Sequence, residues 1–163
     1  MTDIIEEQVP EGFEQLPEGF GFTDSLAPFY RRIAGEEVSF GLIVPAQHRH
    51  TMGICHGGVL MTLADMTAAT GVNLARGELS GSPTISMNID FVSAAQRGQW
   101  IQADTEEVSI KRRFGFCRGT IFNRQGVVAR FNGTFYFPDH QGMWKEGKVP
   151  SSLLDAQQGD ADV

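Results

Sequence analysis

Hydrophobic and polar residues alternate along much of the chain with a period of two, which is typical of β-strands. The clearest example is 84–92, where every second position is apolar: Ile85, Met87, Ile89 and Phe91. Similar patterns predict further strands, at 28–33, 38–44, 99–110, 114–122 and 127–137. Residues 34–37 and 123–126 provide turns between neighbouring strands.

The segment from Gly57 to Arg76 breaks this period and predicts one long helix, closed by Gly77. Its apolar side chains cover the whole circumference at ~100° per residue, so we expect the helix to be buried on all sides. The order of two strands, one helix and four strands predicts an α+β fold, in which an antiparallel sheet wraps around one central helix.

The two ends of the chain differ from its middle. A chain of 163 residues is expected to form one domain, carried here by residues 28–138. Residues 1–27 form an extension with a short duplication, Pro-Glu-Gly-Phe at 10–13 and 17–20, which either lays aromatic rings on the core or is partly loose. Residues 139–163 are expected to be a polar tail or a short helix of low order.

Charge and cysteine content exclude several classes of function. The formal net charge of −7 argues against nucleic acid as a main partner. Cys55 and Cys117 are too few for a disulfide framework or a cysteine zinc site, so a reducing cytoplasm is the expected location. The acidic N-terminus does not resemble a secretory signal, and no apolar run is long enough to span a membrane.

The charge is unevenly distributed, because the segment from Val108 to Pro138 has no acidic residue. It contains six basic residues: Lys111, Arg112, Arg113, Arg118, Arg124 and Arg130. Two interpretations stay open. These residues are either solvated strand positions or a docking surface for a small polyanion.

One charge interrupts the predicted helix, at Asp65. None of the side chains on its face of the helix can neutralise a carboxylate, and burying an unpaired carboxylate costs free energy. Asp65 therefore either faces a solvent edge, caps a neighbouring loop, or is a functional carboxylate in a cleft.

The start of the helix is the second candidate for chemistry. His50 to Gly58 is a turn-rich segment before a helix N-terminus, where backbone N–H groups have no intrahelical partner. Two glycines leave this backbone open to close approach, as is needed to polarise a carbonyl and hold an oxyanion. Gly57 and Gly58 alone would predict only a tight turn.

Other groups in this segment are weaker candidates. His48 is expected to be a polar loop residue. A metal site built from the three histidines of residues 48–56 has no supporting carboxylate or cysteine spacing, so no metal is expected. Cys55 adjoins the helix N-terminus, which favours a thiolate nucleophile, but a small buried residue is the favoured interpretation.

The segment from His56 to Asp65, His-Gly-Gly-Val-Leu-Met-Thr-Leu-Ala-Asp, resembles the HGGxxxxLAD signature of PaaI-like hotdog-fold acyl-CoA thioesterases. The resemblance extends from about Phe29 to Pro138. It implies a hotdog fold, no cofactor beyond the CoA of the substrate, and a homodimer, often paired into a homotetramer, with active sites at the dimer interface.

The resemblance also implies roles for individual residues. The Gly57 N–H would contact the thioester carbonyl, and His56 would brace the turn. Asp65 from the facing subunit would act as general base or nucleophile, and Thr84 would help to place the attacking water. The basic residues that would hold the acyl-CoA nucleotide are Lys111, Arg112 and Arg113.

The chain departs from the family pattern at His50, where an Asn usually donates a second hydrogen bond to the carbonyl. A neutral imidazole can donate one hydrogen bond, so His50 can replace that Asn or change the chemistry. Two alternatives to a thioesterase stay open. One is a hotdog hydratase or dehydratase that uses His50 and Asp65, and the other is a non-catalytic acyl-CoA-binding module.

Overall fold

The computed structural model describes residues 7–77 and 81–139 of the chain. The order of its long elements is the predicted one: two strands, a helix and four strands. The elements are β1 (Glu14–Gln15), η1 (Gly21–Leu26), β2 (Tyr30–Ala34), β3 (Glu37–Ile43), η2 (Ala46–His48), α1 (Gly57–Arg76), β4 (Thr84–Phe91), β5 (Trp100–Lys111), β6 (Phe114–Asn123) and β7 (Gly126–Tyr136). The tail expected at 139–163 lies outside the described residues, apart from Asp139.

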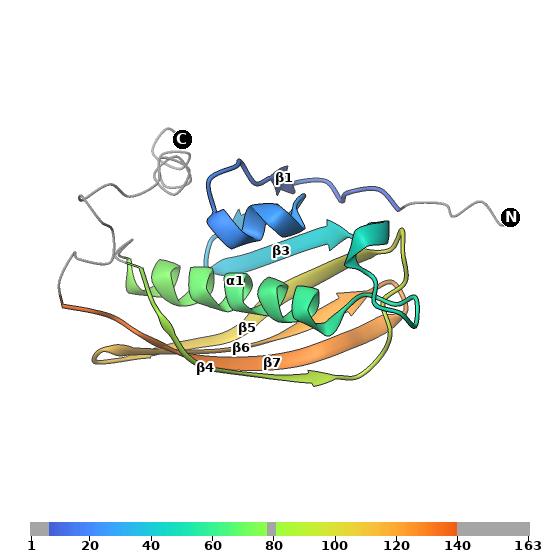
Figure 1. Cartoon of the computed structure of the whole chain (residues 1–163). Coiled ribbons are helices and arrows are strands. Elements are labelled where there is room, and N and C mark those ends of the chain that lie inside the picture. The colour runs from blue at the N-terminus through green and yellow to red at the C-terminus, as the bar shows by residue number, and fades with distance from the viewer. Residues whose placement is uncertain (1–6, 78–80, 140–163) are drawn as a thin grey trace, which may run out of the picture.

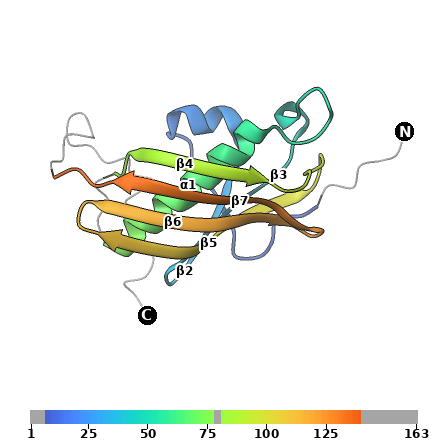
Figure 2. The same cartoon turned by 90° about the horizontal axis from the view of Figure 1, so that it is seen from below.

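The strands form one antiparallel sheet in the order β1-β2-β3-β5-β6-β7-β4, and α1 lies across one of its faces (Figure 1). The predicted α+β fold is therefore confirmed. In the described part of the chain β4 pairs only with β7, so β4 forms one edge of the sheet (Figure 2). No helix among the described residues is long and apolar enough to cross a membrane.

The helix begins and ends where the sequence predicts, but its expected burial on all sides is wrong. One side packs into the core, where Leu63, Ala68 and Val72 are fully buried. On the other side Gly58 is exposed, and further residues are only half-buried: Met61, Thr62, Asp65 and Met66. A single sheet covers only one side of a helix, so the apolar residues of the open side lie at the surface of this chain.

The N-terminal extension contacts the sheet through Glu7 and Phe13, as expected if it lays an aromatic ring on the rest of the domain, whereas Phe22 is 71 % exposed. The Phe13 ring meets the Trp100 ring edge to face at 5.0 Å between centroids. The Glu7 carboxylate accepts a hydrogen bond of 3.2 Å from the Trp100 backbone N–H. β1 pairs with β2 and so forms the opposite edge of the sheet, whereas no strand of the described residues pairs with the outer side of β4.

Candidate functional site

The start of α1 is held by His56, the N-cap residue of the helix. The Gly58 N–H donates a 2.8 Å hydrogen bond to His56 Nδ1, and the His56 N–H donates to the His48 carbonyl at 2.7 Å. Because Nδ1 accepts, the proton of the neutral ring is on Nε2. His56 thus lies at the turn before α1, which it is expected to brace.

His50 is fixed in a similar way on the loop before the helix. The Met52 N–H donates to His50 Nδ1 at 2.9 Å, and the Gly53 N–H donates to the His50 carbonyl at 2.9 Å. The neutral His50 ring therefore also carries its proton on Nε2, as a hydrogen-bond donor. The two imidazoles meet edge to face, with 6.2 Å between the centroids of His50 and His56.

Gly57 is the first residue of α1, and its N–H has no hydrogen-bond partner in the described part of the chain. A helix N-terminus presents such N–H groups with partial positive charge, which suits a carbonyl oxygen or an oxyanion. A Cβ atom on Gly57 would lie 2.9 Å from Phe91 Cζ, so the Phe91 ring packs directly on this glycine. Sequence reasoning placed Phe91 on a strand but missed this contact, which brings together positions 34 residues apart in the chain.

Asp65 has a partner that the sequence did not reveal. Thr84 Oγ1, at the start of β4, donates a 2.7 Å hydrogen bond to Asp65 Oδ1. The half-buried carboxylate is therefore neither unpaired nor the cap of a neighbouring loop. One carboxylate oxygen is held by Thr84, and Oδ2 has no partner among the described residues.

Gly57 and Asp65 lie well apart along α1 within one chain. They are eight residues apart on α1, which corresponds to about 12 Å along the helix axis. The carbon and oxygen of a carbonyl are only about 1.2 Å apart. A carbonyl group bound at the Gly57 N–H therefore cannot also contact the Asp65 carboxylate of the same chain directly.

The basic residues do not form one surface. Lys111, Arg112 and Arg113 lie together at the turn between β5 and β6, at the end of the molecule where α1 ends (Figure 1). Arg124 lies on the turn between β6 and β7, 3.6 Å from the Glu7 carboxylate, and Arg118 pairs with Glu107 of the neighbouring strand at 2.9 Å. A single docking surface of all six residues is therefore excluded, and only the β5–β6 turn remains as a basic cluster.

Within this turn Arg113 has side-chain partners, whereas Arg112 has no acidic partner among the described residues. Arg113 Nη2 lies 2.6 Å from Asp139, and Nη1 donates to the Tyr136 hydroxyl at 3.3 Å; the bonds to Tyr136 and Asp139 raise the pKa of this guanidinium. Lys111 and Arg112 have no acidic partner among the described residues. Arg112 has a φ of 55°, a left-handed conformation that glycine or asparagine adopts more readily than arginine.

His48 is buried, so the expectation of a polar loop residue is wrong. It is 3 % exposed, neither ring nitrogen has a hydrogen-bond partner among the described residues, and burial lowers its pKa. Nowhere in residues 7–77 and 81–139 do three His, Cys, Asp or Glu side chains gather as metal ligands require.

Cys55 is buried, and burial raises the pKa of its thiol to about 12; burial, together with the charge of Glu106, has the same effect on Cys117. A raised pKa keeps both thiols protonated and unreactive at neutral pH. We expect neither cysteine to react with iodoacetamide at pH 8 in the native protein, and both to react in denaturant, as mass spectrometry would measure. Rapid alkylation of native Cys55 would restore the nucleophile interpretation.

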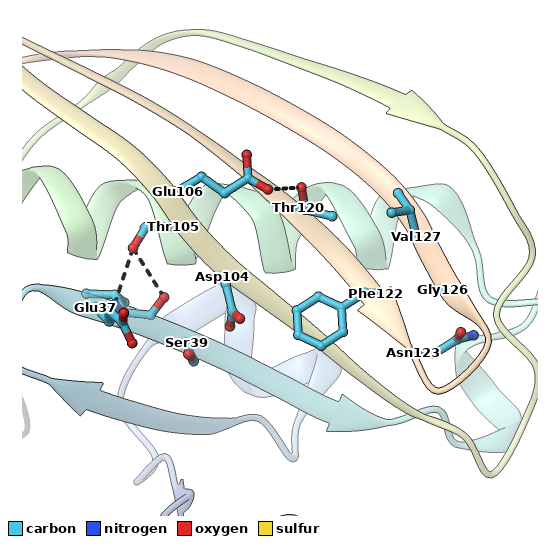
Figure 3. A pocket seen from close by; sticks show the side chains of 11 residues that line it. Glu37, Ser39, Asp104, Thr105, Glu106, Thr120, Phe122, Asn123, Gly126 and Val127 are labelled. Atoms are coloured by element: carbon cyan, nitrogen blue, oxygen red, sulfur yellow. Dashed lines mark hydrogen bonds between the residues drawn. The ribbon is translucent and has the colours of Figure 1, made fainter.

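A hollow between β3, β5 and β6 is lined partly by acidic side chains, those of Glu37, Asp104 and Glu106 (Figure 3). None of the residues discussed above for chemistry lines it. This hollow is therefore separate from Gly57, Asp65 and Thr84.

Comparisons with known proteins agree with this fold. A family model described as the thioesterase superfamily matches residues 52–130, a range that includes Gly57, Asp65 and Thr84. A Pseudomonas aeruginosa protein with a provisional esterase name is 29 % identical over 131 residues, which cover 80 % of this chain and 98 % of that protein.

Two solved structures extend the comparison. A mutant of the phenylacetic acid degradation protein PaaI from Thermus thermophilus is similar with a TM-score of 0.64 and 28 % identity, over 72 % of this chain and 98 % of that chain. A Streptococcus mutans protein solved with bound acetyl-CoA has the same fold, with a TM-score of 0.59 and 18 % identity, over 82 % of this chain and 94 % of that chain.

Proposed function

We propose that this chain, which belongs to the thioesterase superfamily and has its hotdog fold, hydrolyses an acyl-CoA thioester to a free acid and CoA. The observation that carries the proposal is the Asp65–Thr84 pair on the open side of α1. Thr84 holds one carboxylate oxygen and leaves Oδ2 for a water molecule. The acetyl-CoA in a protein of the same fold supports this choice of substrate class.

The site is proposed to form between two copies of the chain. Gly57 and Asp65 of one chain are separated by about 12 Å along α1, so one carbonyl group cannot contact both, which supports a site that takes the carboxylate from a second chain. A second copy joined at the open β4 edge would supply Asp65 of the partner subunit. We therefore expect a homodimer as the smallest active form, and a homotetramer if two dimers pair.

The reaction follows from this arrangement. The thioester carbonyl accepts hydrogen bonds from the Gly57 N–H and from His50 Nε2–H, which hold the oxyanion as it develops. Asp65 of the partner subunit takes a proton from water while the water oxygen bonds to the carbonyl carbon. The C–S bond then breaks, and the CoA thiolate receives the proton from the carboxyl group of Asp65. His56 acts as a positioning residue, because its Nδ1 holds the Gly58 N–H and so the start of α1.

The nucleotide of CoA is proposed to bind at the β5–β6 turn of the partner subunit, through its Lys111, Arg112 and Arg113, because within one chain this turn lies at the opposite end of α1 from Gly57, about 30 Å along the helix axis. Arg112 is the strongest candidate, because it has no acidic partner in the described part of the chain and adopts a left-handed backbone conformation. Such a conformation costs about 1–3 kcal/mol in a residue other than glycine, and this kind of cost is typical of functional positions.

Arg112→Gly should therefore raise KM for acyl-CoA about fivefold to tenfold with kcat nearly unchanged, since phosphate contacts are largely uniform binding. The same change should raise the melting temperature, because glycine adopts this φ without strain. Arg124→Gly, at the turn between β6 and β7, is the matched control and should leave KM unchanged. An unaltered KM in Arg112→Gly would place the nucleotide elsewhere.

A thiol-release assay over short, medium, long and aromatic acyl-CoAs tests the proposed function. Hydrolysis of at least one of them with a kcat above ~1 s⁻¹ is the expected result. Hydration of an enoyl-CoA without release of thiol would replace the proposal with a hydratase. Binding of acyl-CoA in calorimetry without any turnover would replace it with a binding module.

A further inference from the structure

We propose that Phe91 determines acyl specificity by restricting branching at the carbon next to the thioester carbonyl. This inference rests on the proposed function, and it names the preferred substrates as acyl-CoAs that are unbranched at that carbon. It starts from the contact between the Phe91 ring and Gly57, which lies at the group proposed to bind the carbonyl.

The ring lies close against the start of α1. A Cβ atom built on Gly57 would be 2.9 Å from Phe91 Cζ, closer than real Cβ contacts come, and 3.3 Å from Cε1, which is tighter than most. The tip of the ring therefore fills the space that a side chain at residue 57 would need. That space adjoins the backbone N–H of Gly57, because the nitrogen and a Cβ atom share the same Cα.

The ring also has surface left for a ligand, since the Phe91 residue is 57 % exposed in the single chain. An aromatic ring that served the core alone would be covered. Here the tip of the ring contacts Gly57, while more than half of the residue's surface is exposed in the single chain. Substrate bound at the Gly57 N–H would therefore lie beside a ring that has apolar surface to offer.

Backbone hydrogen bonds next to Phe91 limit how far its ring can move away from Gly57. After β4, the N–H groups of Val92 and Ser93 both donate to the Val128 carbonyl, at 2.8 and 3.1 Å. The Cys55 N–H donates to the Ala95 carbonyl at 2.8 Å, which ties the loop before α1 to the same segment. The segment after Phe91 and the loop before Gly57 are thus fixed by hydrogen bonds, which keeps the ring in contact with the glycine.

The chemistry of the substrate completes the argument. When the carbonyl oxygen accepts from the Gly57 N–H, the carbonyl carbon and its two substituents lie beside the ring. One substituent is the sulfur that leads to the polar amides of CoA, and the other is the apolar acyl carbon, which suits contact with a phenyl ring. A methyl branch on that acyl carbon would need space that the ring occupies.

The test compares kcat/KM for two substrates: the straight-chain acyl-CoA that the protein hydrolyses best, and its 2-methyl derivative. Phe91→Leu should raise the ratio of branched to straight substrate by about tenfold or more, since one methyl group in an apolar pocket is worth about 10–200-fold. Phe91→Trp should lower the ratio. Val92→Ala is the matched control, because Val92 is adjacent and 51 % exposed, and it should leave the ratio unchanged.

The outcomes separate this inference from the function on which it rests. If both Phe91 variants release thiol from both substrates with the parent ratio, Phe91 is not the wall of the acyl site, and the thioesterase proposal stands. If the parent protein releases thiol from no acyl-CoA, the proposed function fails and the inference fails with it. Opposite shifts of the branched-to-straight ratio in Phe91→Leu and Phe91→Trp support both the thioesterase proposal and the role of Phe91.

Discussion

Replacing Asp65 with Asn should lower kcat by about 10²–10⁴-fold and leave KM nearly unchanged, because a positioned general base typically contributes a factor of this size. The variant keeps the shape of the side chain, and its amide oxygen can still accept the hydrogen bond from Thr84 Oγ1, which is 2.7 Å in the parent. What it loses is the ability to take a proton from water at the other side-chain atom.

The melting temperature should separate a catalytic role from a structural one. A half-buried carboxylate with one hydrogen-bond donor is poorly compensated, so Asp65→Asn should be as stable as the parent or more stable. Asp65→Glu should keep part of the activity, since one extra methylene moves the oxygens away from their best position. Parent-like thioesterase kinetics in Asp65→Asn would show that the carboxylate is structural and that the proposed mechanism is wrong.

Replacing Ile85 with Lys should disrupt the assembly and lower kcat/KM by about 10³-fold or more, because the carbonyl-binding group and the base would no longer meet. Ile85 is 60 % exposed and lies on β4, which forms the open edge of the described sheet. In a dimer joined at this edge its side chain would be covered, and burying an unpaired ammonium there costs several kcal/mol.

Light scattering and thioesterase activity, both measured as a function of protein concentration, test this prediction. Ile85→Lys should be monomeric at micromolar concentration and should recover activity as its concentration rises, as mass action requires. Phe22→Lys is the matched control: Phe22 is 71 % exposed on η1 of the N-terminal extension, and the change should affect neither assembly nor activity. Full activity in a monomeric Ile85→Lys variant would contradict the site between subunits.

The sequence alone predicted the long elements of the fold with good accuracy. The helix from Gly57 to Arg76 begins and ends at the predicted residues, since the loss of the two-residue period and the glycine that closes the helix are local signals. The ends of the predicted strands lie within two residues of the observed ones, because alternation of polar and apolar residues is also a local pattern. β1, η1 and η2 were missed, because they are short and lack a clear period.

The candidate residues were also found from the sequence, but the contacts between them in the folded chain were not. The lone charge of Asp65 and the glycines at the helix start drew attention by residue type and position. The hydrogen bond from Thr84 and the packing of Phe91 on Gly57 join positions 19 and 34 residues apart. No local pattern contains such contacts, because they depend on where β4 lies against α1.

The sequence by itself determined which segments are helix and strand and which side chains can do chemistry, since backbone preferences and titratable groups belong to individual residues and their near neighbours. Only the tertiary structure decided that the basic block divides between two turns and three strands, that His48 is buried, and that one side of α1 stays open. These properties depend on the order of strands in the sheet and on the single layer it forms, because burial and proximity arise from the packing of segments distant in the chain.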